Sequence, residues 1–176
     1  MANEPVQKGT VFDGNGILLL CQPFENPTRP TIAELTASSA VRITYGTATD
    51  GFAHNTSFAS VTTGRWGLKQ VLTLEGQRTD DLTIKYVYNR AEPTEVETAL
   101  GTPGVEYDVV KIVGYPNDHV IDEDTKINAI IPIRTASATD VPEAANTEVM
   151  KQMIPEIRAE VITEERIQVV AGGSGD

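Results

Sequence analysis

The sequence is poor in cysteine and in long apolar runs. Cys21 is the single cysteine among 176 residues, so no disulfide can form within the chain. Because it follows the apolar residues 17–20, it is typical of a small buried side chain. The longest apolar run, residues 17–21, is far shorter than the ~20 residues that span a bilayer. Residues 1–10 lack the basic and apolar parts of a signal peptide. We therefore expect a protein made in the cytoplasm without a membrane segment.

Positive charge is also scarce. The chain has 25 acidic residues against 14 Lys and Arg, a formal net charge of −11, which argues against gripping a nucleic acid backbone. Aromatic residues make up only 6%, yet 40% of the residues are hydrophobic, enough to bury a core. We predict a single domain at residues 1–171 with an N-terminal arm, followed by a flexible glycine-rich tail at residues 172–176.

No catalytic or ligand-binding constellation stands out. His54 and His119 have no nucleophile at a diagnostic spacing. The acidic segment 118–124 lacks the central glycine and the closing glutamate of a calcium loop, so it is typical of a solvated loop. The glycine spacings do not match a phosphate-binding loop. We expect no catalytic residue, no metal and no cofactor.

Three segments show the alternation of β-strands. Residues 82–88 place Leu82, Ile84, Tyr86 and Tyr88 on one face and Thr83, Lys85 and Val87 on the other. Residues 126–134 collect Ile127, Ala129, Ile131 and Ile133 in the same way. Residues 107–113 carry apolar side chains on both faces, which suits a strand that is covered on both sides. Further strands are expected at residues 17–22 and 41–45. The protein is predicted to be mainly β.

Two short helices are indicated by their caps. Thr31 can cap a helical turn at residues 32–35, with Glu34 in the position of a capping box. Thr94 precedes a short acidic helix that ends at Gly101. The C-terminal part is ambiguous. We favour strands at residues 149–153, 156–162 and 166–170, and a helix beginning at Pro155 is the alternative.

Residues 46–67 are rich in Thr, Gly, Ser and Ala without a sustained apolar stripe. We interpret them as a long partner-binding loop, with a strand pair that has a polar face as the alternative. A strand opening at Leu72 and Leu74 is then expected to turn near residues 79–81 and pair with residues 82–88 as a hairpin.

The order of these pieces resembles the major tail tube proteins of long-tailed, non-contractile bacteriophages, particularly of phages that infect actinobacteria. The segments that carry the resemblance are residues 30–36, the Asp-Gly-Phe step at 50–52, residues 82–88, residues 89–94 before the short helix, and residues 107–111. They extend over roughly residues 31–170. The Arg and Gly expected near the end of the post-helix strand appear as Lys111 and Gly114, a partial departure.

The resemblance implies an antiparallel β-sandwich or half-barrel with one short flanking α-helix, a long loop and extended terminal arms. It implies six-membered rings that stack into a hollow tube in the virion tail, assembled in the host cytoplasm, through which double-stranded DNA passes without specific binding. A tape-measure protein and tail initiator and terminator proteins would be its partners. The alternatives are an inner-tube protein of a contractile injection machine and a monomeric β-rich binding module; a small enzyme is a more distant one.

Two sets of residues are candidates for assembly contacts. The ring-stacking loop would use Asp50, Phe52, His54, Phe58 and Arg65, and contacts between subunits would use Ile32, Glu34 and Leu35. Six copies at −11 give −66 per ring, so carboxylates that face the lumen would keep DNA from adhering. Polar-face residues such as Thr83 and Lys85 would line the channel or face outward.

Overall fold

Two antiparallel sheets form the protein in the computed structural model, which describes residues 9, 11–67, 69–145 and 147–172. The mainly β prediction is confirmed, because the described chain contains two short α-helices and two sheets. Most of the predicted N-terminal arm, and the predicted flexible tail except Gly172, lie outside the described residues.

The first sheet has the strand order β10-β6-β5-β1-β2, and β9 also pairs with β6. Its strands are β1 (Gly16–Cys21), β2 (Val41–Arg42), β5 (Glu106–Val113), β6 (Ala129–Arg134), β9 (Glu156–Ile157) and β10 (Ile162–Thr163). The central strand β5 is buried on both faces, with Val109 in one core cluster and Val110 and Ile112 in another. This confirms the prediction for residues 107–113.

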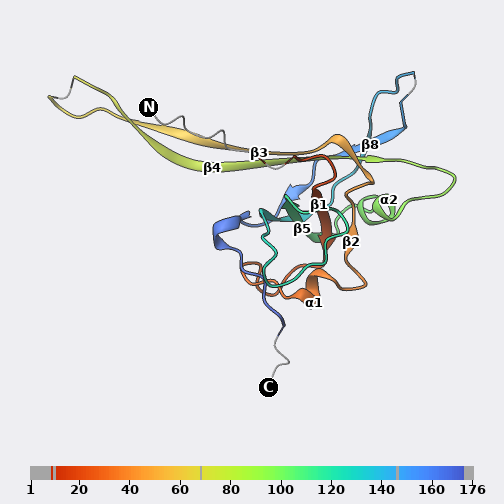
Figure 1. The fold of residues 1–176 in the computed structure, drawn as a ribbon. Helices are drawn as coiled ribbons and strands as arrows, with labels where there is room; N and C mark the ends of the chain where they lie inside the picture. The colour runs from red at the N-terminus through yellow and green to blue at the C-terminus, as the bar shows by residue number, and fades with distance from the viewer. Residues whose placement is uncertain (1–8, 10, 68, 146, 173–176) are drawn as a thin grey trace, which may run out of the picture.

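The second sheet has the order β3-β4-β8-β7 and contains the longest strands. These are β3 (Thr47–Thr63), β4 (Leu72–Val87), β7 (Thr139–Asp140) and β8 (Met150–Met153). Figure 1 shows that β3 and β4 continue as a two-stranded hairpin well beyond the body of the protein. The hairpin defines the shape of the molecule.

The predicted loop at residues 46–67 is wrong, and the alternative of a polar strand pair is correct. Residues 47–63 pair with β4 from Thr47↔Tyr86 to Thr63↔Leu72, with two register shifts. Thr-rich segments fit a pleated surface well. An apolar stripe is missing because most of this strand lies outside the body and has no core to face.

The predicted turn at residues 79–81 is also wrong, since β4 runs through it without a break. Asp80 and Asp81 pair with Thr56 and Asn55 across the hairpin. The Asp80 carboxylate bonds to His54 and Thr56 on the opposite strand, and these contacts stabilise an aspartate in the middle of a strand. The chain turns instead between Thr63 and Leu72, where Gly67 has a φ of 83°.

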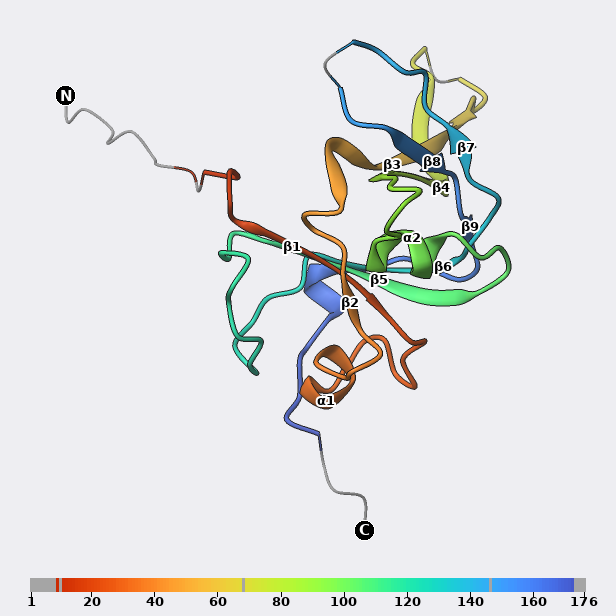
Figure 2. The ribbon, with the colours of Figure 1, turned by 90° about the vertical axis from the view of Figure 1, so that its right-hand side faces the viewer.

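The core consists of two layers, one on each face of the first sheet. One layer, between the sheets, joins Leu82, Ile84, Tyr86 and Met153 to Val109, Ile131 and Ile133, and includes Val96 and Leu100 of α2 (Glu95–Leu100). The other layer joins Ile17, Leu19, Val110, Ile112 and Ile130 to Leu35 of α1 (Ile32–Leu35) and to Val169. Figure 2 shows α2 between the sheets and α1 on the far side.

Both helices begin at the predicted caps. The Thr31 side chain accepts a hydrogen bond from the Glu34 N–H, while Glu34 accepts from the Thr31 N–H at 2.8 Å, which completes a capping box. The Thr94 hydroxyl accepts from the Glu97 N–H. The helix that was expected to flank the sandwich is α2, and it ends at Gly101 as predicted.

The C-terminal part is made of strands, as favoured. The alternative helix from Pro155 is wrong, because the buried Pro155 separates β8 from β9. The expected strand at residues 156–162 is broken into β9 and β10. The expected strand at residues 166–170 is reduced to a bridge between Thr31 and Val170 after the 3-10 turn Glu164–Arg166. The expected strand at 41–45 ends at Arg42.

Candidate assembly surface

The distal hairpin, residues 57–79 without residue 68, exposes apolar side chains that the single chain leaves uncovered. Its exposed large hydrophobic residues are Phe58, Val61, Trp66, Val71, Leu72 and Leu74. Val61 and Leu74 are register partners across the hairpin and remain 47% and 55% exposed. Clusters of exposed apolar side chains of this kind mark interaction sites. The distal hairpin is therefore the strongest candidate for a contact with another protein.

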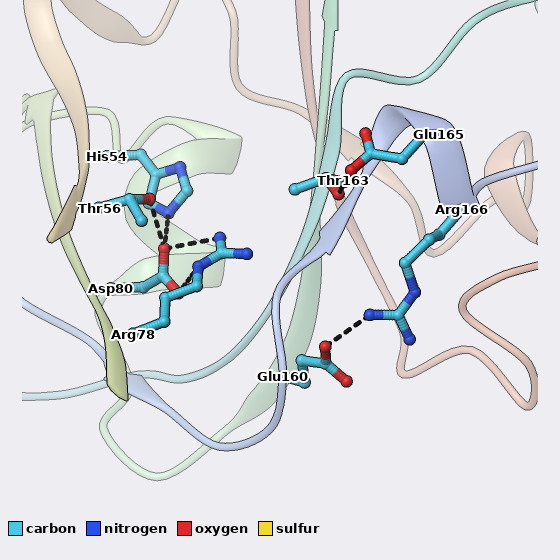
Figure 3. A network of polar contacts seen from close by, with 8 residues as sticks. All are labelled: His54, Thr56, Arg78, Asp80, Glu160, Thr163, Glu165 and Arg166. Atoms are coloured by element: carbon cyan, nitrogen blue, oxygen red, sulfur yellow. Dashed lines mark hydrogen bonds and ion pairs between the residues drawn. The ribbon is translucent and has the colours of Figure 1, made fainter. Parts of the chain in front are cut away.

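A polar network at the root of the distal hairpin holds its two strands together (Figure 3). The Asp80 carboxylate lies 3.0 Å from His54 Nε2, accepts from the Thr56 hydroxyl at 2.6 Å, and pairs with Arg78 Nε at 2.7 Å. Burial alone would raise the pKa of Asp80, but the hydrogen bonds from Arg78, Thr56 and His54 lower it. The ionised form of Asp80 is therefore favoured, and the network holds the two strands together where the hairpin leaves the body.

A second ion pair lies near this network on the C-terminal segment. Arg166 donates to Glu160 at 2.5 Å (Figure 3). The pKa of Glu160 is lowered chiefly by Arg166, and the charge of Arg78 contributes as well. The C-terminal segment thus places a carboxylate within the electrostatic reach of the hairpin root.

The outer face of the second sheet points away from the core. Side chains alternate along a strand, and Leu82, Ile84 and Tyr86 of β4 are buried. The alternate residues of β4 and their register partners therefore lie on the outer face: Ala53, Asn55, Asp81, Thr83, Lys85 and Gln152. Lys85 Nζ pairs with Asp50 Oδ2 at 2.8 Å across the face. Figure 1 shows no described helix or strand over the side of β3 and β4 that faces away from β1 and β5. The side chains of the outer face are small or polar, and no described helix or strand covers them.

Free strand edges complete the candidate surface. In the described residues, β3 has β4 on one side only, and β7 ends the sheet on the other. β3 is a 17-residue strand, so it presents a long row of backbone donors and acceptors. Such an edge is a template for pairing with another chain.

Of the predicted stacking residues, Asp50, Phe52, His54 and Phe58 lie on the strand β3 rather than in a loop, and Arg65 lies just beyond its end. Asp50 pairs with Lys85, Phe52 packs against the core between the sheets, and His54 contacts Asp80. Phe58 and Arg65 are exposed on the distal hairpin. The first three thus have partners within the chain, and the last two are available to another protein.

The residues predicted for contacts between subunits belong to α1. Leu35 is buried in the core, and Glu34 caps its own helix. Ile32 is half-buried against the same core cluster. Their role toward a neighbour stays a prediction, and Ile32 and Glu34 are the two with exposed surface.

Apart from Phe58, sequence reasoning missed the apolar residues of the distal hairpin as contact residues. Leu72 and Leu74 were recognised as alternating strand residues, but alternation does not reveal that both strands extend beyond the core. Val61 gave no signal because it is isolated among Thr and Ser residues. Trp66 lies within residues 46–67, which were interpreted as a loop, and was not among the predicted contact residues.

The remaining chemical groups have structural explanations. Cys21 is buried, as predicted, and burial followed by the charges of Asp108 and Glu34 raises its pKa to about 12. His119 stacks on Tyr115 with ring centroids 4.4 Å apart and contacts Thr125. The described residues contain no group of three or more His, Cys, Asp or Glu placed to hold a metal ion. Nor does any helix in the described part of the chain have the length and apolarity needed to cross a membrane.

Comparisons with known proteins give one family. A family model described as phage tail tube protein matches residues 4–164. A search of curated protein sequences gives no significant match. Among solved structures, a chain of the 6-fold symmetrised cryo-EM structure of the anti-feeding prophage baseplate is similar, with 10% identity and a TM-score of 0.47. The similarity covers 94% of this chain and 99% of that one.

Proposed function

Because the chain belongs to the phage tail tube protein family, which makes it a structural protein of the virion tail, we propose that it forms six-membered rings that stack into a hollow tube. DNA passes through this tube to the host cell. Residues 1–171 act as one tail-tube domain in this assembly, and the chain has no catalytic task. The observation that carries the proposal is the long hairpin, which has a free strand edge and an uncovered apolar end.

Ring formation would use the free edges of the second sheet. The β3 edge of one copy pairs with the β7 side of the next, so that copies join their sheets around a closed barrel. Closure satisfies backbone groups that the single copy leaves open and removes the exposed edges. Ile32 and Glu34 would add contacts between subunits.

Stacking would use the distal hairpin, which extends beyond the body along the direction of the strands. Phe58 and Arg65 are its exposed members among the predicted stacking residues, and Val61, Trp66 and Leu74 join them. A contact that buries these side chains against the next ring would be favoured by the hydrophobic effect.

The outer face would line the channel. Its side chains are short or polar, so DNA finds few apolar or cationic groups to bind, and Lys85 is already paired with Asp50. At −11 per copy a ring of six carries −66, which repels the phosphate backbone. The same channel would hold a tape-measure protein during assembly, and initiator and terminator proteins would bind its two ends.

The proposal is tested by negative-stain electron microscopy and sedimentation of the purified protein over a concentration series. We expect rings or hollow tubes that increase with concentration. The double variant Val61→Asp with Leu74→Asp should fold but assemble poorly, because two charges enter the apolar contact. Val120→Asp is the matched control, since Val120 is 78% exposed on a distant loop.

A wild-type protein that stays monomeric at all concentrations would count against self-assembly and favour the monomeric binding module. Tubes formed equally well by the double variant would instead exclude the distal hairpin as the stacking element.

A further inference from the structure

A groove opens at the end of the second sheet that is opposite to the hairpin tip. Three of its lining residues show its position: Thr47 begins β3, Val87 ends β4, and Met150 begins β8, whereas the tip lies between Thr63 and Leu72. The cavity has a volume of about 750 Å³. The tip and the groove therefore lie at opposite ends of the same two strands.

Aromatic and aliphatic side chains form much of the groove, and several are uncovered. Phe12 and Tyr45 are 63% and 79% exposed, and Phe52 and Met150 are half-buried beside them. Exposed aromatic rings around a cavity of this volume offer apolar surface that the described part of the chain leaves open to a partner.

Among the described residues that line the groove, two are acidic and one is basic. Asp13 and Glu148 lie in its wall and are exposed. Lys111 is the basic residue among the described lining residues, and its Nζ lies 5.8 Å from the centre of the Phe52 ring, close enough for a cation–π contact. An incoming partner thus meets two carboxylates and several apolar side chains.

The tip has the complementary composition. Residues 61–74 contain Arg65 and Lys69 and no acidic residue, although the whole chain has a net charge of −11. Trp66, between these cations, is fully exposed. Trp and Arg are the residue types that most often dominate the energy of protein interfaces.

We propose that the hairpin tip of a second copy of this chain docks in the groove, with Trp66 against Tyr45 and Phe12, and with Arg65 and Lys69 beside Asp13 and Glu148. This inference rests on the proposed function, because it identifies where the stacking hairpin binds on the next ring. The contact is heterologous, joining two different surfaces. Repeated from copy to copy along the hairpin direction, it does not close on itself and builds a stack.

The first test uses two variants, each with one added cysteine, in separate preparations. One carries Gly64→Cys on the tip and the other Thr49→Cys in the groove wall, both at exposed sites that leave Trp66 and Tyr45 in place, and the native Cys21 is buried in each. The two proteins are mixed in the reduced state and then oxidised. We expect the mixture to give a disulfide-linked heterodimer, with a higher yield of dimer than either variant gives alone. A mixture that gives no excess overturns the docking.

Charge reversal tests the electrostatic part of the same contact. Adding Arg65→Glu and Lys69→Glu to the Gly64→Cys protein should lower the yield of heterodimer by about tenfold, because like charges then face one another. Adding Asp13→Lys and Glu148→Lys to the Thr49→Cys protein should restore the yield. A heterodimer yield that stays the same in both charge-reversed proteins would overturn the proposed pairing of charges.

Electron microscopy of the wild-type protein separates this inference from the proposed function. Tubes without the cross-link would mean that the chain stacks through another surface, which overturns the docking and leaves the tube intact. A cross-link without rings or tubes would support the docking and overturn the ring assembly.

Discussion

Asp108 is a buried carboxylate on which two distant segments meet. Its oxygens accept a hydrogen bond from the Phe24 N–H at 2.8 Å and pair with Arg158 at 2.6 Å, and its side chain is only 3% exposed. Burial raises the pKa of Asp108, although the Phe24 N–H and Arg158 oppose this shift. Asp108 therefore joins β5 to the segment after β1 and to the C-terminal part.

Replacing Asp108 with Ala should lower the free energy of unfolding by about 3 kcal/mol, because it leaves the Arg158 charge and the Phe24 N–H without a buried partner. Denaturant unfolding measures the change. Glu106→Ala removes an ion pair with Arg134 at the surface and serves as the control, for which a much smaller loss is expected. Equal losses in the two variants would contradict a special role for the buried pair.

Because of the Asp80 network, the stability of the protein should decrease in acid. The pKa of Asp80 is lower in the folded protein than in the unfolded chain, so its stabilising contribution is present above about pH 4 and is lost as the pH falls through the folded pKa. Asp80→Asn should therefore destabilise the protein at neutral pH and have little effect in acid. Thermal unfolding of both proteins across this range measures it.

Asp81→Asn is the neighbouring control, because it removes the same charge from the outer face, away from His54 and Arg78. A stability difference between Asp80→Asn and the wild type that persists unchanged in strong acid would show that the network does not act through the ionised carboxylate.

The strand β3 depends on a bulge near Gly51, where the register shifts between Thr47 and Phe52. A Cβ atom at Gly51 would lie 2.5 Å from the Lys85 carbonyl oxygen and 2.8 Å from the Ala48 nitrogen. Both are backbone atoms within the sheet, so they cannot move without disturbing the strand pairing. Gly51 therefore allows the two strands to approach where the hairpin begins.

Gly51→Ala should lower the free energy of unfolding by about 1–3 kcal/mol, since the bulge must open to admit the methyl group. Gly64→Ala is the matched control, because nothing lies within 4 Å of its added Cβ. Denaturant unfolding compares the two, and hydrogen exchange of β3 localises the effect. A Gly51→Ala protein as stable as Gly64→Ala would mean that the bulge tolerates a side chain.

The elements that the sequence predicted well are those whose signals are local. Thr31 with Glu34, and Thr94 with Gly101, mark helix ends through contacts within a few residues. The alternation in residues 82–88 reports a core that lies directly beneath them. The hairpin could not be predicted in the same way, because β3 pairs with residues that lie far away in the sequence and mostly faces solvent. Asp80 and Asp81 suggested a turn, and only their partners across the hairpin explain the strand.

The candidate site was predictable only in part, because the orientation of its side chains depends on segments that are distant in the sequence. Phe58 and Arg65 were placed on an element that would meet a partner, and both are exposed on the distal hairpin. Phe52 and His54 looked equally available in the sequence, yet the sheet turns them toward the core and toward Asp80. Which face of a strand is buried depends on the opposite sheet, and the sequence of one strand does not contain that information.

As a whole, the molecule has an acidic body and a hairpin tip without carboxylates. The channel proposal predicts that acids on the outer face keep DNA mobile. Asp81→Lys should slow DNA ejection and increase DNA retention by assembled tubes in a salt-dependent way, while assembly continues. The rate of ejection from particles that carry the variant, and co-sedimentation of DNA with tubes, measure these effects.

Glu123→Lys makes the same change of charge on an exposed loop outside the sheets and should leave the ejection rate unchanged. An Asp81→Lys protein with unchanged ejection and DNA retention would argue that Asp81 does not face the channel.

The most direct test of the account is a cryo-electron microscopy reconstruction of the assembled protein. It is expected to show a hollow tube with six copies in each ring, with Thr83 and Lys85 on the channel wall and the distal hairpin crossing to the next ring. An assembly that has another symmetry, or that turns the outer face of the second sheet away from the lumen, would contradict it.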